Sequence, residues 1–304
     1  MLYRSTELKF ISSYQEQYMD REDLSLRNQI EQWLVRDFGK FQEISYLKSH
    51  KNHVYMVVFE DGHKYVVKAR GLNTSNNVFQ NEIALLNFLY EKGLRVPKII
   101  ARSQNRFMMM EFIEGISLEN CKKKRIWKTV GKLVTTFRNI SLDEVKPYIR
   151  RPWSDFETLE SKFEKHKLLK PPFTQILKEA KKIWSTGELT FIHSDFGPGQ
   201  VLVNENGVDI AIIDWENASE GSILAPLARC IAMVREYLKN EQFIEGLKEG
   251  FEEIIPLTNE MKFELHIREM ISHMRDMSWK LEWYPEHHNH AMEIAEKIEK
   301  WTEM

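Results

Sequence analysis

Two carboxylates and one amide side chain are spaced along the chain in a way that suits phosphoryl-transfer chemistry. Asp195 and Gln200 belong to a Gly- and Pro-rich loop, and Asp214 ends a later apolar run. A turn at Asn204–Gly207 would fold the intervening segment into a hairpin, so we expect the three side chains to meet at one edge. Oxygen ligands of this kind, too few to enclose a metal ion, suit Mg²⁺ whose remaining ligands are water and nucleotide phosphates.

Each of these residues also has an ordinary structural explanation. His193 and Asp195 alone would more often be a buried histidine beside a loop cap, and Asp214 alone could be a turn residue at a strand end. The spacing from Asp195 to Gln200 and Asp214 favours the chemical interpretation. We expect His193 itself to be structural, with its ring bonded to neighbouring backbone.

Composition limits the class of protein. The chain has 304 residues, 42% of them hydrophobic, which is enough for about two domains with substantial cores. Lys and Arg number 43 against 45 Asp and Glu, so there is no signature of a nucleic-acid partner. No apolar run approaches the roughly 18 residues of a membrane span, and the N-terminus lacks a signal-like apolar segment; we therefore expect a cytoplasmic protein with no membrane partner. Cys121 and Cys230 have neither disulfide-framework nor zinc spacing.

The first part of the chain should fold as a helix followed by a sheet. Residues 1–40 show a helical apolar stripe that stops at Gly39, and we interpret them as a helical extension that covers the next domain. Alternating apolar residues then predict five antiparallel strands, with one helix from Asn77 to Glu91 between the third and the fourth. The strands are expected around Ile44–Tyr46, Val54–Phe59, Tyr65–Lys68, Pro97–Ile100 and Arg106–Phe112.

The second part of the chain should be mostly helical. Prolines, including the pair Pro171-Pro172, divide its first half into short segments, and Trp215–Gly221 is expected to be a polar loop. Helices are predicted from their apolar spacing over residues 126–140, 173–184, 223–238, 243–254, 261–281 and 290–301.

The ordered set of His193, Asp195, Gln200 and Asp214 resembles the aminoglycoside phosphotransferase family, and also the macrolide kinases of that superfamily. The resemblance extends from about residue 41 to about residue 238. It implies an α+β, two-lobed protein-kinase-like fold with an N-terminal antiparallel five-stranded sheet plus a helix and a mostly helical C-terminal lobe. The domains would be a helical extension at 1–40, a nucleotide-binding lobe at 41–112, and a helical lobe at 113–304 with a catalytic hairpin at 189–214 and acceptor-binding helices.

The resemblance implies roles for the loop residues. Asp195 would orient or deprotonate the acceptor hydroxyl, while Gln200 and Asp214 would hold Mg²⁺. Asn is the usual family residue at the position of Gln200. The neighbouring Gly197 and Gly199 have the backbone range to accommodate the longer side chain.

Nucleotide binding is implied for a second group of residues. Lys68 ends an apolar strand, and taken alone this position would be explained by a lysine side chain that reaches solvent from the strand end. In the family pattern, however, the lysine at this position pairs with Glu82 and contacts the nucleotide phosphates. Backbone groups of Glu111 and Ile113 would bind adenine at a hinge, next to Met110. The turn at residues 49–53, which would cover the phosphates, contains no glycine.

These features together predict an ATP-dependent small-molecule kinase, with GTP as an alternative donor and with Mg²⁺. Neither the Asp-Phe-Gly nor the Ala-Pro-Glu sequence of protein kinases follows Asp214. Aminoglycosides or macrolides are candidate acceptors, which would make the protein an antibiotic-resistance enzyme; the alternative is a degenerate, nucleotide-binding regulatory protein. Aminoglycosides should require carboxylates and macrolides an apolar pocket. Candidate acceptor-binding residues are Asp276, Trp279, Glu282, Trp283, Tyr284 and Glu286.

Overall fold

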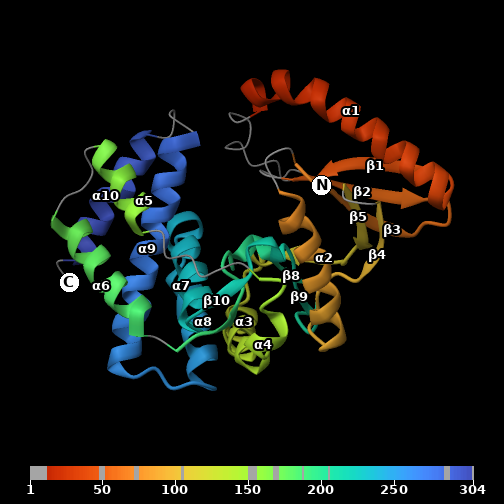
Figure 1. Ribbon diagram of the computed structural model, residues 1–304. Helices are drawn as coiled ribbons and strands as arrows, with labels where there is room; N and C mark the ends of the chain where they lie inside the picture. Colours follow the sequence, from red (N-terminus) through yellow and green to blue (C-terminus); the bar gives the residue numbers. More distant parts are fainter. Residues whose placement is uncertain are drawn as a thin grey trace. The chain divides into compact units, whose positions relative to one another are not determined.

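The computed structural model describes residues 12–47, 52–71, 75–103, 106–149, 156–166, 171–186, 188–204, 206–283 and 288–302 (Figure 1). The chain divides into two compact units. The first comprises residues 1–80 and 98–112, and the second comprises residues 81–97 and 113–304. Helix α2 (Asn76–Glu91) contributes residues to both.

The first unit is built on an antiparallel sheet of five strands in the order β1-β2-β3-β5-β4, as predicted. A short turn joins the second strand to the third, and there Gly62 adopts a positive φ of 82° that glycine tolerates without strain. The strands are β1 (Phe41–Leu47), β2 (His53–Phe59), β3 (Lys64–Ala69), β4 (Ile99–Ser103) and β5 (Phe107–Glu111).

Helix α1 (Ser12–Phe38) covers one face of this sheet (Figure 1). Its buried residues Ile30, Trp33 and Leu34 pack against strand residues such as Tyr55 in one core. Gly39 ends the helix at φ 93°, so the predicted helical extension and its stop are confirmed for the described residues.

The second unit contains a closely packed pair of helices, α3 (Lys124–Thr135) and α8 (Glu241–Glu252). A Cβ atom on Gly131 would lie 2.1 Å from the Leu247 carbonyl oxygen, and one on Gly250 would lie 1.8 Å from the carbonyl oxygen of Lys128. Only glycine therefore permits this approach. The predicted helix over 126–140 is shorter than expected, because α3 gives way to the 3₁₀ turn η3 (Thr136–Asn139).

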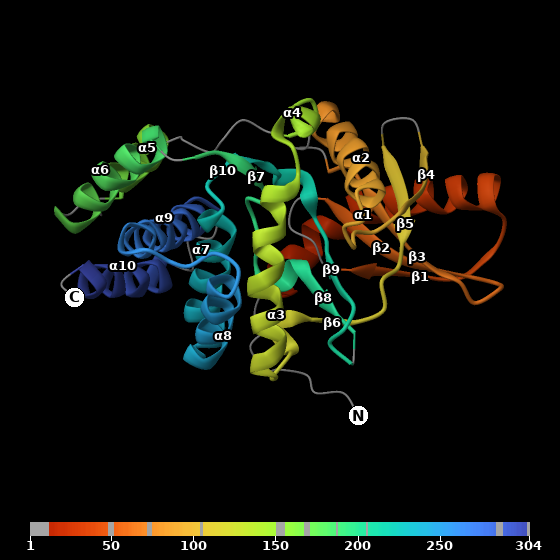
Figure 2. The same ribbon diagram turned by 90° about the horizontal axis from the view of Figure 1, so that it is seen from below.

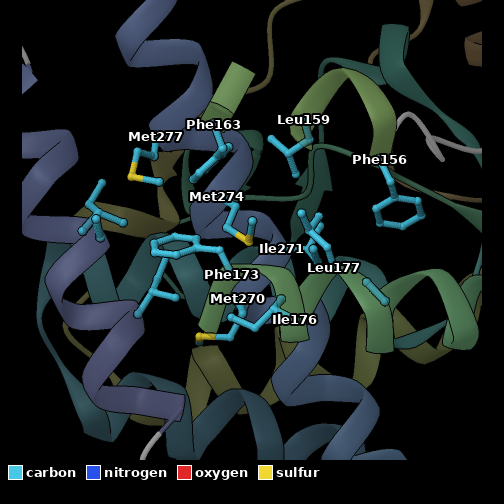
Figure 3. Close-up of a cluster of buried hydrophobic side chains, with 14 of the residues drawn as sticks. Phe156, Leu159, Phe163, Phe173, Ile176, Leu177, Met270, Ile271, Met274 and Met277 are labelled. Carbon is cyan, nitrogen blue, oxygen red and sulfur yellow. The ribbon is translucent and has the colours of Figure 1, made fainter. Parts of the chain in front are cut away.

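A bundle of four helices encloses one hydrophobic core of the second unit. Met270, Met274 and Met277 of α9 lie among phenylalanines from the neighbouring helices (Figure 3). The bundle consists of α5 (Phe156–Lys165), α6 (Pro171–Thr186), α9 (Asn259–Trp283) and α10 (His288–Thr302). The prediction that the Pro171-Pro172 pair precedes the helix is wrong, because the prolines form the first turn of α6, where the missing N–H groups have no helical partner in any case.

Short strands complete the second unit (Figure 2). The predicted hairpin is present as β8 (Val201–Val203) paired with β9 (Ile210–Ile212), and β6 (Ile116–Ser117) pairs with β8. The expected loop after Asp214 instead contains the 3₁₀ turn η5 (Trp215–Asn217) and β10 (Ser219–Gly221), which pairs with β7 (Thr190–Ile192). The remaining elements are η2 (Leu118–Asn120), α4 (Leu142–Val145), η4 (Pro198–Gln200), α7 (Leu224–Met233) and the π-helical turn η6 (Val234–Leu238). None of the described helices is long and apolar enough to span a membrane.

Candidate active site

A buried aromatic cluster supports the loop that carries Asp195. Phe191 and Trp215 stack with their ring centroids 5.6 Å apart, and Phe137 meets both rings edge-on. The Trp215 indole N–H donates to the Ile212 carbonyl at 3.0 Å, so the turn after β9 is fixed to the same cluster. Packed interiors resist displacement, and the cluster therefore gives the loop a rigid base.

His193 is a structural residue, as predicted. Its side chain is completely buried, and its Nε2 atom donates to the Ile213 carbonyl at 3.1 Å. Burial lowers the pKa of His193, and this effect outweighs the hydrogen bond to Ile213 and the charges of Asp195 and Asp214, which raise it. A neutral ring that links the loop to the strand end is not suited to carrying a proton.

The hairpin brings Gln200 and the segment before Asp214 together. The backbone N–H of Ile213 donates to the Gln200 carbonyl at 2.9 Å. The side-chain Oε1 atom of Gln200 is buried and has no hydrogen-bond partner among the described residues. Asp214 is exposed and adopts the left-handed backbone conformation, with φ 64° and ψ 60°, which is strained for a residue other than glycine and is often found at functional sites.

This arrangement fits a divalent cation shared with a ligand. The buried amide oxygen of Gln200 and the exposed carboxylate of Asp214, on adjacent segments of one hairpin, are a partial set of oxygen ligands. The described residues contain no group of three or more His, Cys, Asp or Glu side chains that could hold a metal ion unaided. Any Mg²⁺ bound here would therefore complete its coordination with water or phosphate.

Gly197 accommodates Gln200, but not through backbone freedom as we predicted. Its φ of −125° is available to any residue. A Cβ atom at this position would instead lie 2.9 Å from Oε1 of Gln200 and 2.2 Å from the sulfur of Met233. A Cβ at Gly197 would thus displace the ends of the Gln200 and Met233 side chains, and glycine allows them to approach the loop closely. A Cβ at Gly199 would meet nothing within 4 Å.

Asp195 is held by an arginine that sequence analysis missed. Arg229 of α7 donates from Nε to Oδ1 of Asp195 at 3.2 Å. Its Nη1 atom donates to both carboxylate oxygens of Asp276 at 2.7 Å and to the Ser272 hydroxyl at 3.2 Å. One guanidinium thus joins the catalytic loop to two residues of α9.

The ion pairs keep both groups charged. Desolvation raises the pKa of Asp195, but the positive charge of Arg229, with smaller effects from His193 and Arg275, lowers it below its usual range. Burial likewise lowers the pKa of Arg229, while Asp276 and Asp195 raise it above the ordinary arginine value. Asp195 is therefore a carboxylate at neutral pH and a weak base, better suited to orienting a hydroxyl than to removing its proton early.

Arg229 had a recognisable signal in the sequence. It lies in the apolar run from Leu224 to Met233, and a cation in such a run needs a partner. Asp276 was among the predicted acceptor-binding residues and does lie beside Asp195 through this arginine. Of the other predicted acceptor-binding residues, Trp279 is exposed. Tyr284 and Glu286 lie outside the described residues, as do the side chains of Glu282 and Trp283.

A cavity of about 260 Å³ lies next to the ion pairs that Arg229 makes with Asp195 and Asp276. Ser194, which precedes Asp195, and Arg229, which binds it, both line the cavity. The other lining residues come from β7, β10, α6, α7 and α9 and the segments beside them: Ile183, Trp184, Glu188, Leu189, Ile192, Ser219, Glu220, Gly221, Ser222, Ala225, Arg268, Ile271, Ser272 and Arg275.

The predicted nucleotide-binding residues are divided between the two units. Lys68 is buried on β3, and Glu82 is buried on α2. They belong to different units, so their ion pair stays a prediction. The N–H of Glu111 donates to the Lys98 carbonyl at 2.9 Å; an adenine contact by Glu111 would therefore use its carbonyl oxygen. Ile113 is the first residue of the second unit's main segment, and residues 49–51 of the expected phosphate-covering turn lie outside the described residues.

Solved structures with the same fold are phosphotransferases. The amicoumacin kinase hAmiN, solved with AMP-PNP, Ca²⁺ and Ami, is similar with a TM-score of 0.73 and 13% sequence identity, over 93% of this chain and 96% of that chain. APH(2")-IIia, solved with GDP and kanamycin, has a TM-score of 0.73 and 14% identity, over 90% of this chain and 98% of that chain. Choline kinase LicA from Streptococcus pneumoniae has a TM-score of 0.67 and 17% identity, over 91% of this chain and 99% of that chain. At these identities the likeness shows a kinase-like α+β fold, as predicted.

Sequence comparison identifies the family. A search of curated protein sequences finds no match. The profile described as "Phosphotransferase enzyme family" matches residues 43–262, which is more than half of the chain and includes the segment from Lys68 to Asp214. The chain therefore belongs to the phosphotransferase enzyme family, as the resemblance carried by His193, Asp195, Gln200 and Asp214 predicts.

Proposed function

We propose that this phosphotransferase is a small-molecule kinase that transfers the γ-phosphoryl group of ATP to a hydroxyl group. The observation that carries the proposal is the ionised Asp195, fixed by Arg229 beside a cavity and one hairpin away from Gln200 and Asp214. This arrangement offers one carboxylate to the acceptor and a separate pair of oxygen ligands to a metal–nucleotide complex.

Asp195 is proposed to position the acceptor hydroxyl. A carboxylate with a low pKa accepts a hydrogen bond from the hydroxyl and aims its oxygen at the phosphorus atom, which is the main contribution of such a residue when the transition state is loose. The hydroxyl proton passes to the carboxylate only as the new O–P bond forms.

Gln200 and Asp214 are proposed to hold Mg²⁺ through Oε1 and the carboxylate. The bound ion would offset the charge of the phosphates. Lys68, oriented by Glu82, would place a second positive charge on the nucleotide, and the backbone of Glu111 and Ile113 would bind the adenine. These assignments follow the family pattern, and the structure has Lys68 on β3, Glu82 on α2 and Gln200 at the end of η4.

Nucleotide binding and turnover test the proposal in sequence. We expect MgATP to bind, binding to weaken without Mg²⁺, and Asp214→Ala to remove this Mg²⁺ dependence. Asp195→Asn should bind MgATP normally but lose most phosphoryl transfer to any acceptor found in a screen of hydroxyl compounds. Wild-type turnover in Asp195→Asn would show that the catalytic assignment is wrong.

A degenerate, nucleotide-binding regulatory protein is the second candidate. It is favoured by Gln200 at the usual Asn position and by the turn at residues 49–53 that lacks glycine. The same experiments separate the candidates, since a degenerate protein would bind nucleotide but show no ADP release with any acceptor. The Oε1 atom of Gln200 is buried without a hydrogen-bond partner, and this favours the active enzyme. A protein that no longer bound a metal ion would have no reason to keep a costly unsatisfied polar atom at this position.

A further inference from the structure

Three arginines line the cavity beside Asp195. Arg229 comes from α7, and Arg268 and Arg275 come from α9. The carboxylates that pair with the first two, Asp276 and Glu264, are not among the described residues that line the cavity. Three arginine side chains therefore contribute to the wall, whereas Asp276 and Glu264, which pair with two of them, do not line it.

The side chain of Arg268 is held in place by its contacts. Arg268 is nearly buried; its Nε atom donates to Glu264 at 2.6 Å and its guanidinium lies 3.8 Å from the centroid of the Trp184 ring. Such a fixed guanidinium loses little further freedom when it binds a carboxylate or phosphate. Four serine residues, Ser194, Ser219, Ser222 and Ser272, add hydroxyl groups to the lining.

The positive charges of Arg229 and Arg275 repel each other, which makes the cavity unfavourable for a bound cation. Burial and the charge of Arg229 lower the pKa of Arg275 to about 10, although Asp195 and Asp276 act in the opposite direction. An anion between Arg229 and Arg275 would reduce this repulsion, whereas an ammonium group would increase it. The negative lining residues are Glu188, which is exposed, and Glu220, which is partly buried.

The cavity is also small. Pockets for drug-sized ligands span roughly 300–1,000 Å³, and 260 Å³ lies below this range. Ile183, Trp184 and Ile271 supply an apolar side to the wall.

We propose that this cavity is the acceptor site, and that it binds a small hydroxylated compound bearing a carboxylate or phosphate group at Arg229 and Arg275. The proposal rests on the kinase activity proposed above and narrows its acceptor. It sets this protein apart from a kinase of polycationic aminoglycosides, because the described lining residues include three arginines against the two carboxylates Glu188 and Glu220.

A matched set of compounds tests the charge preference. Gluconate, glucose 6-phosphate, glucose and glucosamine share hydroxyl groups but differ in charge, and kanamycin serves as a polycation. MgATP binding is measured first, without acceptor. If MgATP does not bind, the kinase function is refuted rather than this inference. Binding of each compound to the MgADP complex is then measured by calorimetry, and transfer by ADP release from MgATP. We expect at least one anion to bind on the order of tenfold more tightly than glucose. If no anion exceeds glucose, or if glucosamine or kanamycin binds best, the inference is wrong.

Variants assign the preference to the cavity. Arg275→Gln should raise the KM or Kd for the preferred anion on the order of tenfold, with a smaller effect on kcat. Arg275→Lys keeps the charge and should retain part of the affinity, and it remains informative if the glutamine variant does not fold. The control is Arg125→Gln, at an exposed position on α3, which should behave as wild type. Unchanged anion affinity in folded Arg275→Gln, or an equal loss for glucose, would overturn the proposal.

Discussion

Arg229→Met is expected to destabilise the protein and to change the ionisation of Asp195. The side chain of Arg229 is 16% exposed, and the side chain of its partner Asp276 is 18% exposed. Removal of one member of a buried ion pair leaves an uncompensated charge and costs about 3–5 kcal/mol. Because both groups retain some contact with water, we expect a loss toward the lower end, about 3 kcal/mol. Asp195 adds little to this loss, since its side chain is 39% exposed and is screened by solvent.

Urea unfolding of Arg229→Met, Asp276→Asn and the double variant measures the pair. The double variant removes both charges, so it should recover much of the stability that Arg229→Met loses, and the cycle should give a large coupling energy. A loss below about 1 kcal/mol in Arg229→Met, or a double variant no more stable than the single one, would refute the reasoning. It would mean that water compensates Asp276 as well as the arginine does.

The pH dependence of the same variant tests the link to Asp195. The pKa of Asp195 is lowered in the folded protein, so the stabilisation from its pairing with Arg229 is present above the unfolded-state pKa and is lost as pH falls through the folded-state pKa. Without the arginine, the pKa of Asp195 should rise. The acid limb of the pH–rate profile should therefore move to higher pH in Arg229→Met, whereas Arg125→Gln should leave it unchanged. If the acid limb did not move in Arg229→Met, Arg229 would not control the ionisation that limits turnover, and the link to Asp195 would be wrong.

Three further changes test other parts of the protein. Gln200→Asn should not improve Mg²⁺-dependent turnover, because the loop is packed around the longer side chain; a large gain in both rate and metal affinity in a Mg²⁺ titration would mark Gln200 as a lesion. Lys68→Ala should weaken nucleotide binding more than Glu82→Ala, and fully additive effects in a nucleotide titration would argue against their ion pair. Gly250→Ala should lower the free energy of unfolding by about 1–3 kcal/mol, because its Cβ would collide with the Lys128 carbonyl; an unchanged urea midpoint would contradict this packing.

Local sequence was sufficient for most helices and strands. Their apolar residues repeat with the period of a helix or a strand over five residues or more, and stops such as Gly39 and Gly93 adopt the positive φ that glycine allows. The pairing of β8 with β9 was predictable because a short turn joins them. The three-residue strands β7 and β10 were not, since so short a segment shows no period and its partner lies 27 or more residues away.

The amino-acid sequence by itself determined the family and the order of the residues expected to carry chemistry, because Asp195, Gln200 and Asp214 are neighbours along a single hairpin. Only the tertiary structure decided what surrounds Asp195. Arg229 reaches it from 34 residues away, and Asp276 reaches that arginine from 47 residues away. Such contacts depend on how α7 and α9 pack, and no local pattern encodes the distance between two side chains on different helices. The charge of the acceptor cavity follows from the same packing.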